Sequence, residues 1–146
     1  RYGRPFRMYK FRSMHNDAEA AGPQLCRGRK DPRLTRVGRF LREHHLDELP
    51  QLWNVLRGDM AFIGPRPERR FYIEQIVRQD PRYPLLYQIR PGVTSYATLY
   101  NGYTDTPEKM LRRLELDLYY LEHRSLFLDL KILWLTFCRI VAGRKF

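Results

Sequence analysis

The chain has little cysteine and no long apolar run, and each absence excludes a class of protein. Its two cysteines, Cys26 and Cys138, are too few for a disulfide framework and lack the CxxC spacing of zinc or redox sites. A reduced compartment is therefore expected. No signal peptide and no run of about 18 uncharged apolar residues is present, so the sequence shows neither a secretion signal nor a membrane-spanning segment.

Acidic residues are also scarce, with 16 Asp and Glu against 27 Lys and Arg and a net charge of +11. Arginine supplies most of the positive charge, and its guanidinium group binds phosphate oxygens two at a time. This balance indicates a polyanionic partner, which could be nucleic acid, a phosphate-rich substrate or an anionic membrane. A GC-rich genome would raise the arginine content as well, so composition leaves these alternatives open.

The 146 residues suffice for one domain with a buried core, and 14% aromatic residues exclude wholesale disorder. We expect an α/β (α+β) fold, a helix-rich compact single domain over residues 1–146 with a small short-stranded sheet and interfacial helices. The strand-like segments of the sequence, at 61–67 and 93–96, are short, so the predicted sheet is small. The remaining predictions are an extended arm or short strand at 4–14, a loop at 15–33, and helices starting at Thr35 and spanning 47–57, 68–79, 107–123 and 125–141.

Two of the predicted helices carry further expectations. The helix that starts at Thr35 should point its apolar residues inward, namely Val37, Phe40 and Leu41. The helix over 47–57 should be capped by Asp47 and stopped by Gly58. Its apolar stripe consists of Leu49, Leu52, Trp53 and Leu56.

The last predicted helix, 125–141, has a very wide apolar arc. It is too short and too charged to cross a bilayer. Two interpretations remain open: a helix buried against the core, or a helix in the membrane interface with Phe127, Trp134 and Phe137 at headgroup depth. Lys131 and Arg139 would then lie near anionic lipid.

The densest group of chemically useful residues lies between 42 and 67. Asp47 and Glu48 are paired carboxylates, which suit a nucleophile toward phosphorus or a Mg²⁺ ligand set completed by substrate phosphates. The alternative is that Asp47 only caps its helix. Arg66 lies between two prolines, a rigid frame that presents a guanidinium to phosphate, although an ordinary turn would look the same.

Several motifs in a fixed order resemble the catalytic domain of the bacterial sugar transferases, the monotopic polyprenyl-phosphate phosphoglycosyl transferases. The resemblance covers nearly the whole chain. The matching segments are Lys10-Phe11-Arg12-Ser13-Met14, Asp31-Pro32-Arg33-Leu34-Thr35, Leu46-Asp47-Glu48-Leu49-Pro50-Gln51-Leu52, Gly64-Pro65-Arg66-Pro67, Arg90-Pro91-Gly92-Val93-Thr94, Glu115-Leu116-Asp117 and Leu128-Asp129-Leu130-Lys131-Ile132.

The resemblance implies transfer of a sugar 1-phosphate from a UDP-sugar to polyprenyl (undecaprenyl) phosphate, with release of UMP. This would be the first membrane step of capsule, lipopolysaccharide O-antigen, exopolysaccharide or glycoprotein glycan assembly. It also implies a covalent route with Mg²⁺, in which Asp47 is the nucleophile and Glu48 helps hold the metal or handle protons. The other residues implied in phosphate or substrate binding are Arg42, Arg66, Arg90, Lys10 and Arg12.

The resemblance further implies a location at the cytoplasmic face of the bacterial inner membrane, and it allows a homo-oligomer. Family members carry a re-entrant hydrophobic helix before the region that matches Arg1; this sequence lacks it, so we expect a fragment or a processed chain. Many members read Gly-Trp-Ala-Gln where this chain has Ser95-Tyr96-Ala97-Thr98, so the sugar is left open. The alternatives to the transferase are a basic nucleic-acid-binding module and an interfacial membrane module without catalysis.

Overall fold

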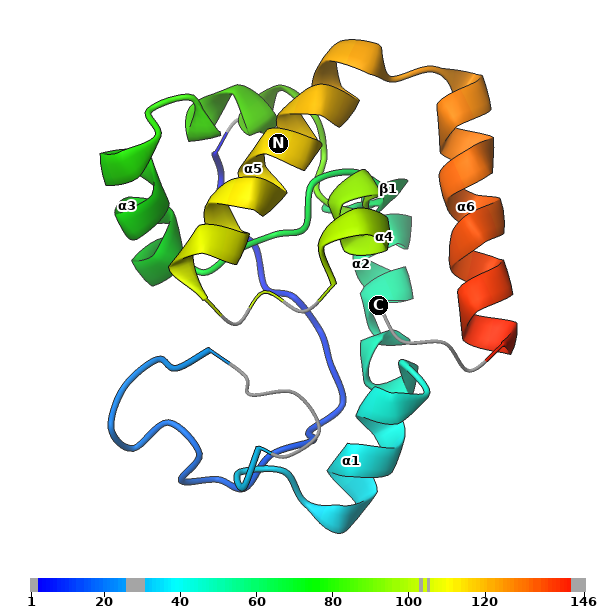
Figure 1. Cartoon of the computed structure of the whole chain (residues 1–146). Coiled ribbons are helices and arrows are strands. Elements are labelled where there is room, and N and C mark those ends of the chain that lie inside the picture. The colour runs from blue at the N-terminus through cyan, green and yellow to red at the C-terminus, as the bar shows by residue number, and fades with distance from the viewer. Residues whose placement is uncertain (1–2, 26–30, 103, 105, 143–146) are drawn as a thin grey trace.

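Helices make up most of the fold in the computed structural model, which describes residues 3–25, 31–102, 104 and 106–142 (Figure 1). The α-helices are α1 (Arg36–Glu43), α2 (Gln51–Leu56), α3 (Arg70–Gln79), α4 (Tyr96–Asn101), α5 (Pro107–His123) and α6 (Leu126–Val141). Two 3-10 helices accompany them, η2 (Leu46–Glu48) and η3 (Tyr83–Gln88).

The sheet has two strands, β1 (Ala61–Ile63) and β2 (Gly92–Thr94). They run parallel, with Ala61 opposite Gly92 and Ile63 opposite Thr94. The connection between them contains α3 and η3, because parallel strands need a long crossover. The expectation of a helix-rich fold with a small, short-stranded sheet is therefore confirmed.

The core consists of two hydrophobic clusters that share α5. In Figure 1 this helix crosses the middle of the molecule, with α3 on one side and α6 on the other. One cluster joins α3, η3 and α5 through Tyr72, Ile76, Tyr83, Leu86, Met110, Leu114 and Leu118. The other joins α4, α5 and α6 through Leu99, Tyr120 and Ile132.

The predicted ends of the last two helices agree closely with the structure. Pro107 is the first residue of α5, where proline needs no hydrogen-bond partner for its nitrogen. Ser125 caps α6 by accepting from Leu128 N–H at 3.2 Å. Tyr96 was expected to extend a strand, but it begins α4 because the Ser95 hydroxyl accepts from Thr98 N–H at 2.9 Å and caps that helix.

The inward orientation predicted for Val37 and Phe40 on α1 is wrong. Val37 is 68% exposed and Phe40 is 54% exposed. The buried position of α1 is Gly38, where an added Cβ would lie 1.8 Å from Ser13 O. Because α1 approaches the N-terminal arm by this glycine, Val37 and Phe40 point away from the contact.

The helix predicted over 47–57 is also different in the structure. Asp47 lies inside η2, and α2 starts only at Gln51, with Pro50 as its N-cap. The predicted capping role of Asp47 is therefore wrong. The buried positions of α2 are Gln51 and Asn54, whereas the apolar stripe predicted for residues 47–57 is exposed, namely Leu49, Leu52, Trp53 and Leu56.

The N-terminal residues 4–14 form an extended arm whose only bridge among the described residues joins Met14 to Leu34. In Figure 1 the arm descends from the side of α5 toward α1. The predicted loop follows, with turns over residues 16–21, while Cys26 lies outside the described residues. The other cysteine, Cys138, is a free thiol on α6.

Helix α6 contacts the rest of the fold by a narrow face and exposes a broad apolar one. Its buried residue is Ile132, and the helix as a whole contacts α4, β1 and β2. Its exposed apolar side chains are Leu126, Phe127, Leu130, Leu133, Trp134, Phe137, Ile140 and Val141, which we call the α6 apolar face. In the part of the chain that the structure describes, no helix has the length and apolar character needed to span a bilayer.

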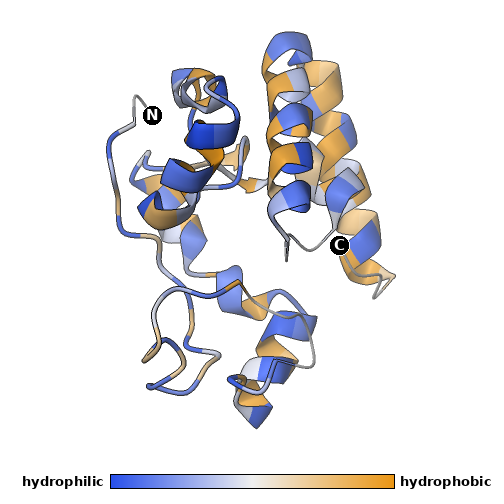
Figure 2. Cartoon of the chain, turned by 60° about the vertical axis from the view of Figure 1, so that its left-hand side comes forward, coloured by the Kyte–Doolittle hydropathy of each residue, from blue (hydrophilic) through white to orange (hydrophobic). Residues whose placement is uncertain are grey.

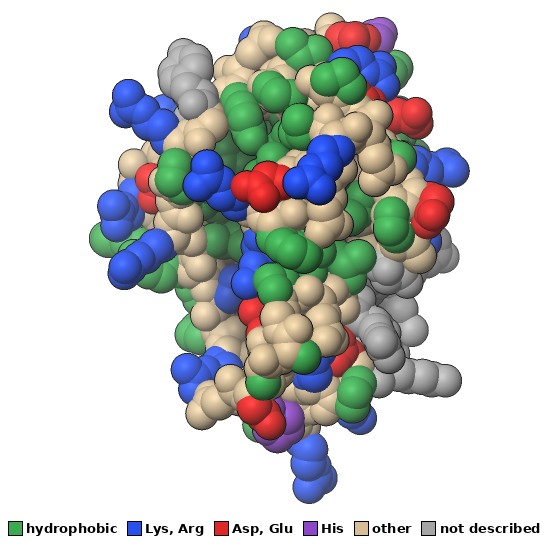
Figure 3. Space-filling model, turned by 90° about the vertical axis from the view of Figure 1, so that its left-hand side faces the viewer, with side chains coloured by type: hydrophobic (Ala, Val, Ile, Leu, Met, Phe, Trp, Pro, Cys, Tyr) green, Lys and Arg blue, Asp and Glu red, His purple; other side chains and the backbone are tan. Residues whose placement is uncertain are grey.

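Hydrophobic and hydrophilic residues alternate along the helices in Figure 2. On the face of the molecule opposite α6, Lys and Arg side chains are scattered among acidic and apolar ones (Figure 3). Among the described residues, this face shows no single basic patch of the kind that a nucleic-acid-binding surface needs.

Candidate active site

Asp47 and Glu48 lie together in η2, in a turn that a left-handed residue introduces. His45, just before η2, has φ 55°, which costs a non-glycine residue about 1–2 kcal/mol. Phe11 N–H donates to Asp47 O at 2.9 Å, so the arm covers the turn. Asp47 is 5% exposed. The two carboxylates are therefore held in a tight turn and not at the N-terminus of an α-helix.

Glu48 accepts hydrogen bonds from two cations, Lys10 and Arg66. Lys10 Nζ lies 2.9 Å from Glu48 Oε1, and Arg66 donates from both Nη atoms to the two carboxylate oxygens. Burial alone would raise the pKa of Glu48, but the charges and hydrogen bonds of Arg66 and Lys10 outweigh it and hold that pKa well below its usual range. Burial, followed by the charge of Arg66, lowers the pKa of Lys10.

Arg42 lies on the side of Asp47. Its Nε donates to Ser13 Oγ at 2.9 Å and lies 3.9 Å from Asp47 Oδ2. Ser13 is buried, and its C=O accepts from Thr35 N–H at 3.1 Å, where α1 starts. Ser13 thus orients Arg42. Sequence reasoning did not single it out, although its place between Arg12 and Met14 in an otherwise apolar and basic arm was a usable signal.

A close backbone contact positions Arg66. A Cβ on Gly92 would lie 2.1 Å from Gly64 N, so these two backbone segments approach each other as closely as only glycines allow. Gly64 N–H donates to Thr94 O at 3.1 Å, and Gly92 N–H donates to Pro65 O at 2.9 Å. The turn that carries Arg66 is therefore fixed to the end of the sheet.

Two of the predicted site residues make other contacts. Arg12 donates to Asn16 Oδ1 at 2.6 Å on the exposed surface. The Arg90 guanidinium lies beside Gly58, with Nη2 3.9 Å from the position that a Cβ there would take. The structure thus brings Lys10, Arg42 and Arg66 to the Asp47–Glu48 pair and places Arg12 and Arg90 outside these contacts.

A second charged group, which sequence reasoning missed, lies next to this cluster. Glu68, two residues beyond Arg66, pairs with Arg113 of α5. Burial lowers the pKa of Arg113 to about 10 and raises the pKa of Asp117 to about 7. Arg113 and Asp117 are one helical turn apart and flank the buried Leu114, so charge beside the apolar face of α5 was the available signal.

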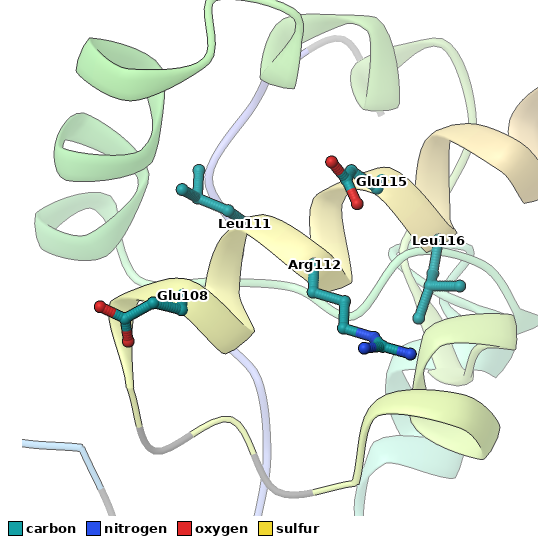
Figure 4. A pocket seen from close by; sticks show the side chains of 5 residues that line it. All are labelled: Glu108, Leu111, Arg112, Glu115 and Leu116. Atoms are coloured by element: carbon teal, nitrogen blue, oxygen red, sulfur yellow. The ribbon is translucent and has the colours of Figure 1, made fainter.

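The described residues contain no group of three His, Cys, Asp or Glu side chains that could hold a metal ion. Mg²⁺ does not require one, because it binds through one or two carboxylates together with phosphates and water. The oxygens of Asp47 and Glu48 fit that kind of site. A hollow of about 410 Å³ on α5 is separate from them, since it is lined by Glu108, Leu111, Arg112, Glu115 and Leu116 (Figure 4).

The charges of the site favour an anionic ligand. Three cations, Lys10, Arg42 and Arg66, accompany the two carboxylates, which leaves one positive charge. Part of each cationic side chain is accessible to solvent. A phosphate group could therefore bind to guanidinium and ammonium groups while a carboxylate stands beside it.

Known proteins with similar sequences are named as transferases of a sugar or a sugar phosphate. One relative from Aeromonas hydrophila, "UDP-N-acetylgalactosamine-undecaprenyl-phosphate N-acetylgalactosaminephosphotransferase", is 42% identical over 96% of this chain and 33% of its own. The "UDP-glucose:undecaprenyl-phosphate glucose-1-phosphate transferase" of Escherichia coli K12 is 42% identical over 92% of this chain and 29% of its own. The "Uncharacterized sugar transferase EpsL" of Bacillus subtilis is 38% identical over 97% of this chain and 66% of its own length.

The chain spans about a third of the length of the first two of these relatives. The profile of the family described as "Bacterial sugar transferase" matches residues 1–143, nearly the whole sequence. This match favours the transferase over the nucleic-acid-binding alternative. The chain belongs to the bacterial sugar transferase family.

Proposed function

We propose that this chain carries the catalytic site of a transferase that moves a sugar 1-phosphate from a UDP-sugar to undecaprenyl phosphate. The observation that carries this proposal is the buried Asp47 beside the Lys10–Glu48–Arg66 cluster, which combines a carboxylate with cations for phosphate. The relatives' names, which contain a UDP-sugar and undecaprenyl phosphate, support the same substrates.

The reaction consists of two displacements at one phosphorus atom. A carboxylate oxygen of Asp47 attacks the phosphorus that bears the sugar, the bond from that phosphorus to the UMP oxygen breaks, and UMP leaves with the bonding electrons. An oxygen of undecaprenyl phosphate then attacks the same phosphorus in the acyl phosphate. The bond to Asp47 breaks, which restores the carboxylate and yields undecaprenyl-diphosphate-sugar. No net proton transfer is needed.

The basic residues bind and orient the phosphates during both displacements. Phosphoryl transfer depends on positioning and charge neutralisation more than on acid–base groups. Arg66 and Lys10 both donate to Glu48, and they also bind phosphate oxygens of the substrate. The turn that carries Arg66 is fixed by the contact between Gly64 and Gly92. Arg42 orients Asp47 from the other side. Arg12 and Arg90 remain predicted substrate contacts at the edge of the site.

The position of Asp47 in η2 suits a nucleophile. A carboxylate that caps an α-helix is engaged by backbone N–H groups, which lowers its reactivity. The N-cap of α2 is instead Pro50, and that cap has no side-chain hydrogen bond. Mg²⁺ held by Asp47, Glu48 and substrate phosphates would neutralise the charge that develops on the phosphate oxygens.

The acceptor's lipid tail requires the site to lie at a membrane surface. We propose that the α6 apolar face docks there, on the cytoplasmic face of the bacterial inner membrane. Exposed Lys131 on the same helix would face anionic headgroups. The face is much wider than the isolated apolar side chains of an ordinary protein surface.

Covalent capture tests the proposed role of Asp47. Radiolabelled UDP-sugar without acceptor should label the wild-type chain and release UMP, whereas Asp47→Asn should stay unlabelled because an amide cannot form the acyl phosphate. Asp80→Asn, which changes a half-buried aspartate paired with Arg82, should label like the wild type. Equal labelling of Asp47→Asn and wild type would remove Asp47 from the nucleophile role. Glu48→Gln should lose turnover without unfolding.

A further inference from the structure

We infer that Asn54 is a positioning residue that clamps the N-terminal arm against η2 and thereby places Lys10 on Glu48. Asn54 is 0% exposed and lies on the buried side of α2. It is 44 residues along the chain from Lys10. The inference rests on the substrate-binding role proposed for Lys10.

The side-chain amide of Asn54 binds the arm in the way that a neighbouring strand would. Tyr9 N–H donates to Asn54 Oδ1 at 3.1 Å, and Asn54 Nδ2 donates to Arg7 O at 2.8 Å. The Asn54 amide has an acceptor oxygen and an NH2 group with two N–H donors. Its oxygen accepts from the arm, and its NH2 group donates to the arm and also, at 3.4 Å, to Asp59 Oδ2, which fixes one orientation of the amide. Residues 7 and 9 are the spacing at which an extended chain presents its N–H and C=O groups to the same side.

The contacts on each side of Lys10 complete the clamp. Tyr9, just before it, donates to Asn54, and Phe11, just after it, donates to Asp47 O at 2.9 Å. The main chain of Lys10 is therefore held at both neighbours by the segment 47–54, which also carries Glu48. Lys10 Nζ reaches Glu48 at 2.9 Å from this fixed backbone.

The backbone of Asn54 makes hydrogen bonds of its own, separate from those of the side chain. Its backbone C=O accepts from Asp59 N–H at 2.9 Å and Met60 N–H at 3.2 Å, where the chain leaves α2 for β1. A change of side chain leaves these bonds in place. Lysine has a long flexible stem, so without the clamp its ammonium group would sample many positions away from Glu48.

A zero-length carbodiimide cross-link between Lys10 and Glu48, measured by mass spectrometry, reports the placement directly. Asn54→Asp keeps the shape but loses the donors to Arg7 O and to Asp59 Oδ2, and we expect about a tenfold lower cross-link yield, equivalent to about 1.4 kcal/mol. Gln51→Met is the control for a changed buried amide on the same helix, and its yield should equal that of the wild type. Gln51 Nε2 is buried without a hydrogen-bond partner.

A second variant avoids the buried site. Tyr9→Pro removes the N–H that Asn54 accepts and changes only the exposed arm, so the domain stays folded. It should lower the cross-link yield as Asn54→Asp does. Met8→Pro places the same ring one residue away and keeps the Tyr9 N–H, so its yield should remain near wild type.

A double-mutant cycle separates positioning from general stability. Asn54→Asp should raise KM for the UDP-sugar in the wild-type background and have no further effect in a Lys10→Met background, because the clamp acts through Lys10. Wild-type cross-link yields in both Asn54→Asp and Tyr9→Pro would overturn the inference, as would full additivity in the cycle. Loss of the cross-link in a chain whose wild type shows no transferase activity would support the clamp and contradict the proposed function.

Discussion

Membrane docking through α6 can be tested at a single side chain, Trp134. This residue is 65% exposed on the α6 apolar face, with its ring 6.2 Å from that of Phe137. A fully buried aromatic side chain covers about 150–250 Å². Roughly 150 Å² of apolar surface on Trp134 is therefore available to lipid, and at about 25 cal/mol per Å² its full immersion contributes about 4 kcal/mol.

Immersion of half of that surface already gives a measurable effect. Trp134→Ala would then lose about 2 kcal/mol, which weakens partitioning onto vesicles about 25-fold. Since the side chain is exposed, the free energy of unfolding should change by no more than about 0.5 kcal/mol. Trp134→Glu should likewise leave folding intact. If Trp134 lay in the core, the same substitution would bury an unpaired charge and unfold the chain.

The assay is flotation on vesicles that contain anionic lipid, with urea unfolding as the parallel measure of stability. Phe71→Ala is the matched control, because Phe71 is an exposed aromatic on α3, on the opposite side of the molecule from α6 (Figure 1). It should float like the wild type. Unchanged flotation of Trp134→Ala, or an equal loss in Phe71→Ala, would refute docking by α6.

Three further predictions concern charge and metal. The pKa of Glu48 lies below its usual value in the folded chain, so Glu48 stabilises the fold above pH 4.5 and its contribution is lost as the pH falls below that; the stability difference between wild type and Glu48→Gln, from urea unfolding, should shrink there. The opposite sign holds for Asp117, whose pKa is raised from 3.8 to about 7: relative to Asp117→Asn, the wild type should lose up to about 4 kcal/mol between pH 4 and 7 and nothing more above it. A pH-independent difference would contradict either assignment. Excess EDTA should abolish UMP release, and added Mg²⁺ should restore it.

The sequence by itself determined the local elements and the family. Pro107 and Ser125 mark helix starts through their own backbone chemistry, so α5 and α6 were predicted nearly to the residue. The family could be identified because the order of short motifs along the chain is itself sequence information. The helix starts could be predicted because they depend on interactions among neighbours in the chain.

Tertiary structure decided which faces are buried. Val37 and Phe40 look like core residues by their spacing, yet Gly38 makes the close contact and turns them outward. Helix α2 buries Gln51 and Asn54 and exposes its leucines, and the backbone of the arm finds its hydrogen-bonding partner in Asn54. The spacing of hydrophobic residues along a helix indicates which of them share a face, but it does not indicate what that face contacts.

Tertiary structure also decided which charges meet. Lys10, Glu48 and Arg66 come from an arm, a 3-10 turn and a loop fixed by two glycines, and no local spacing places them together. Arg12 and Arg90 also lie in segments that match the family motifs, but they make other contacts. The energy of a charge pair depends on the distance and burial of both groups, and these are set only when segments distant in sequence pack against each other.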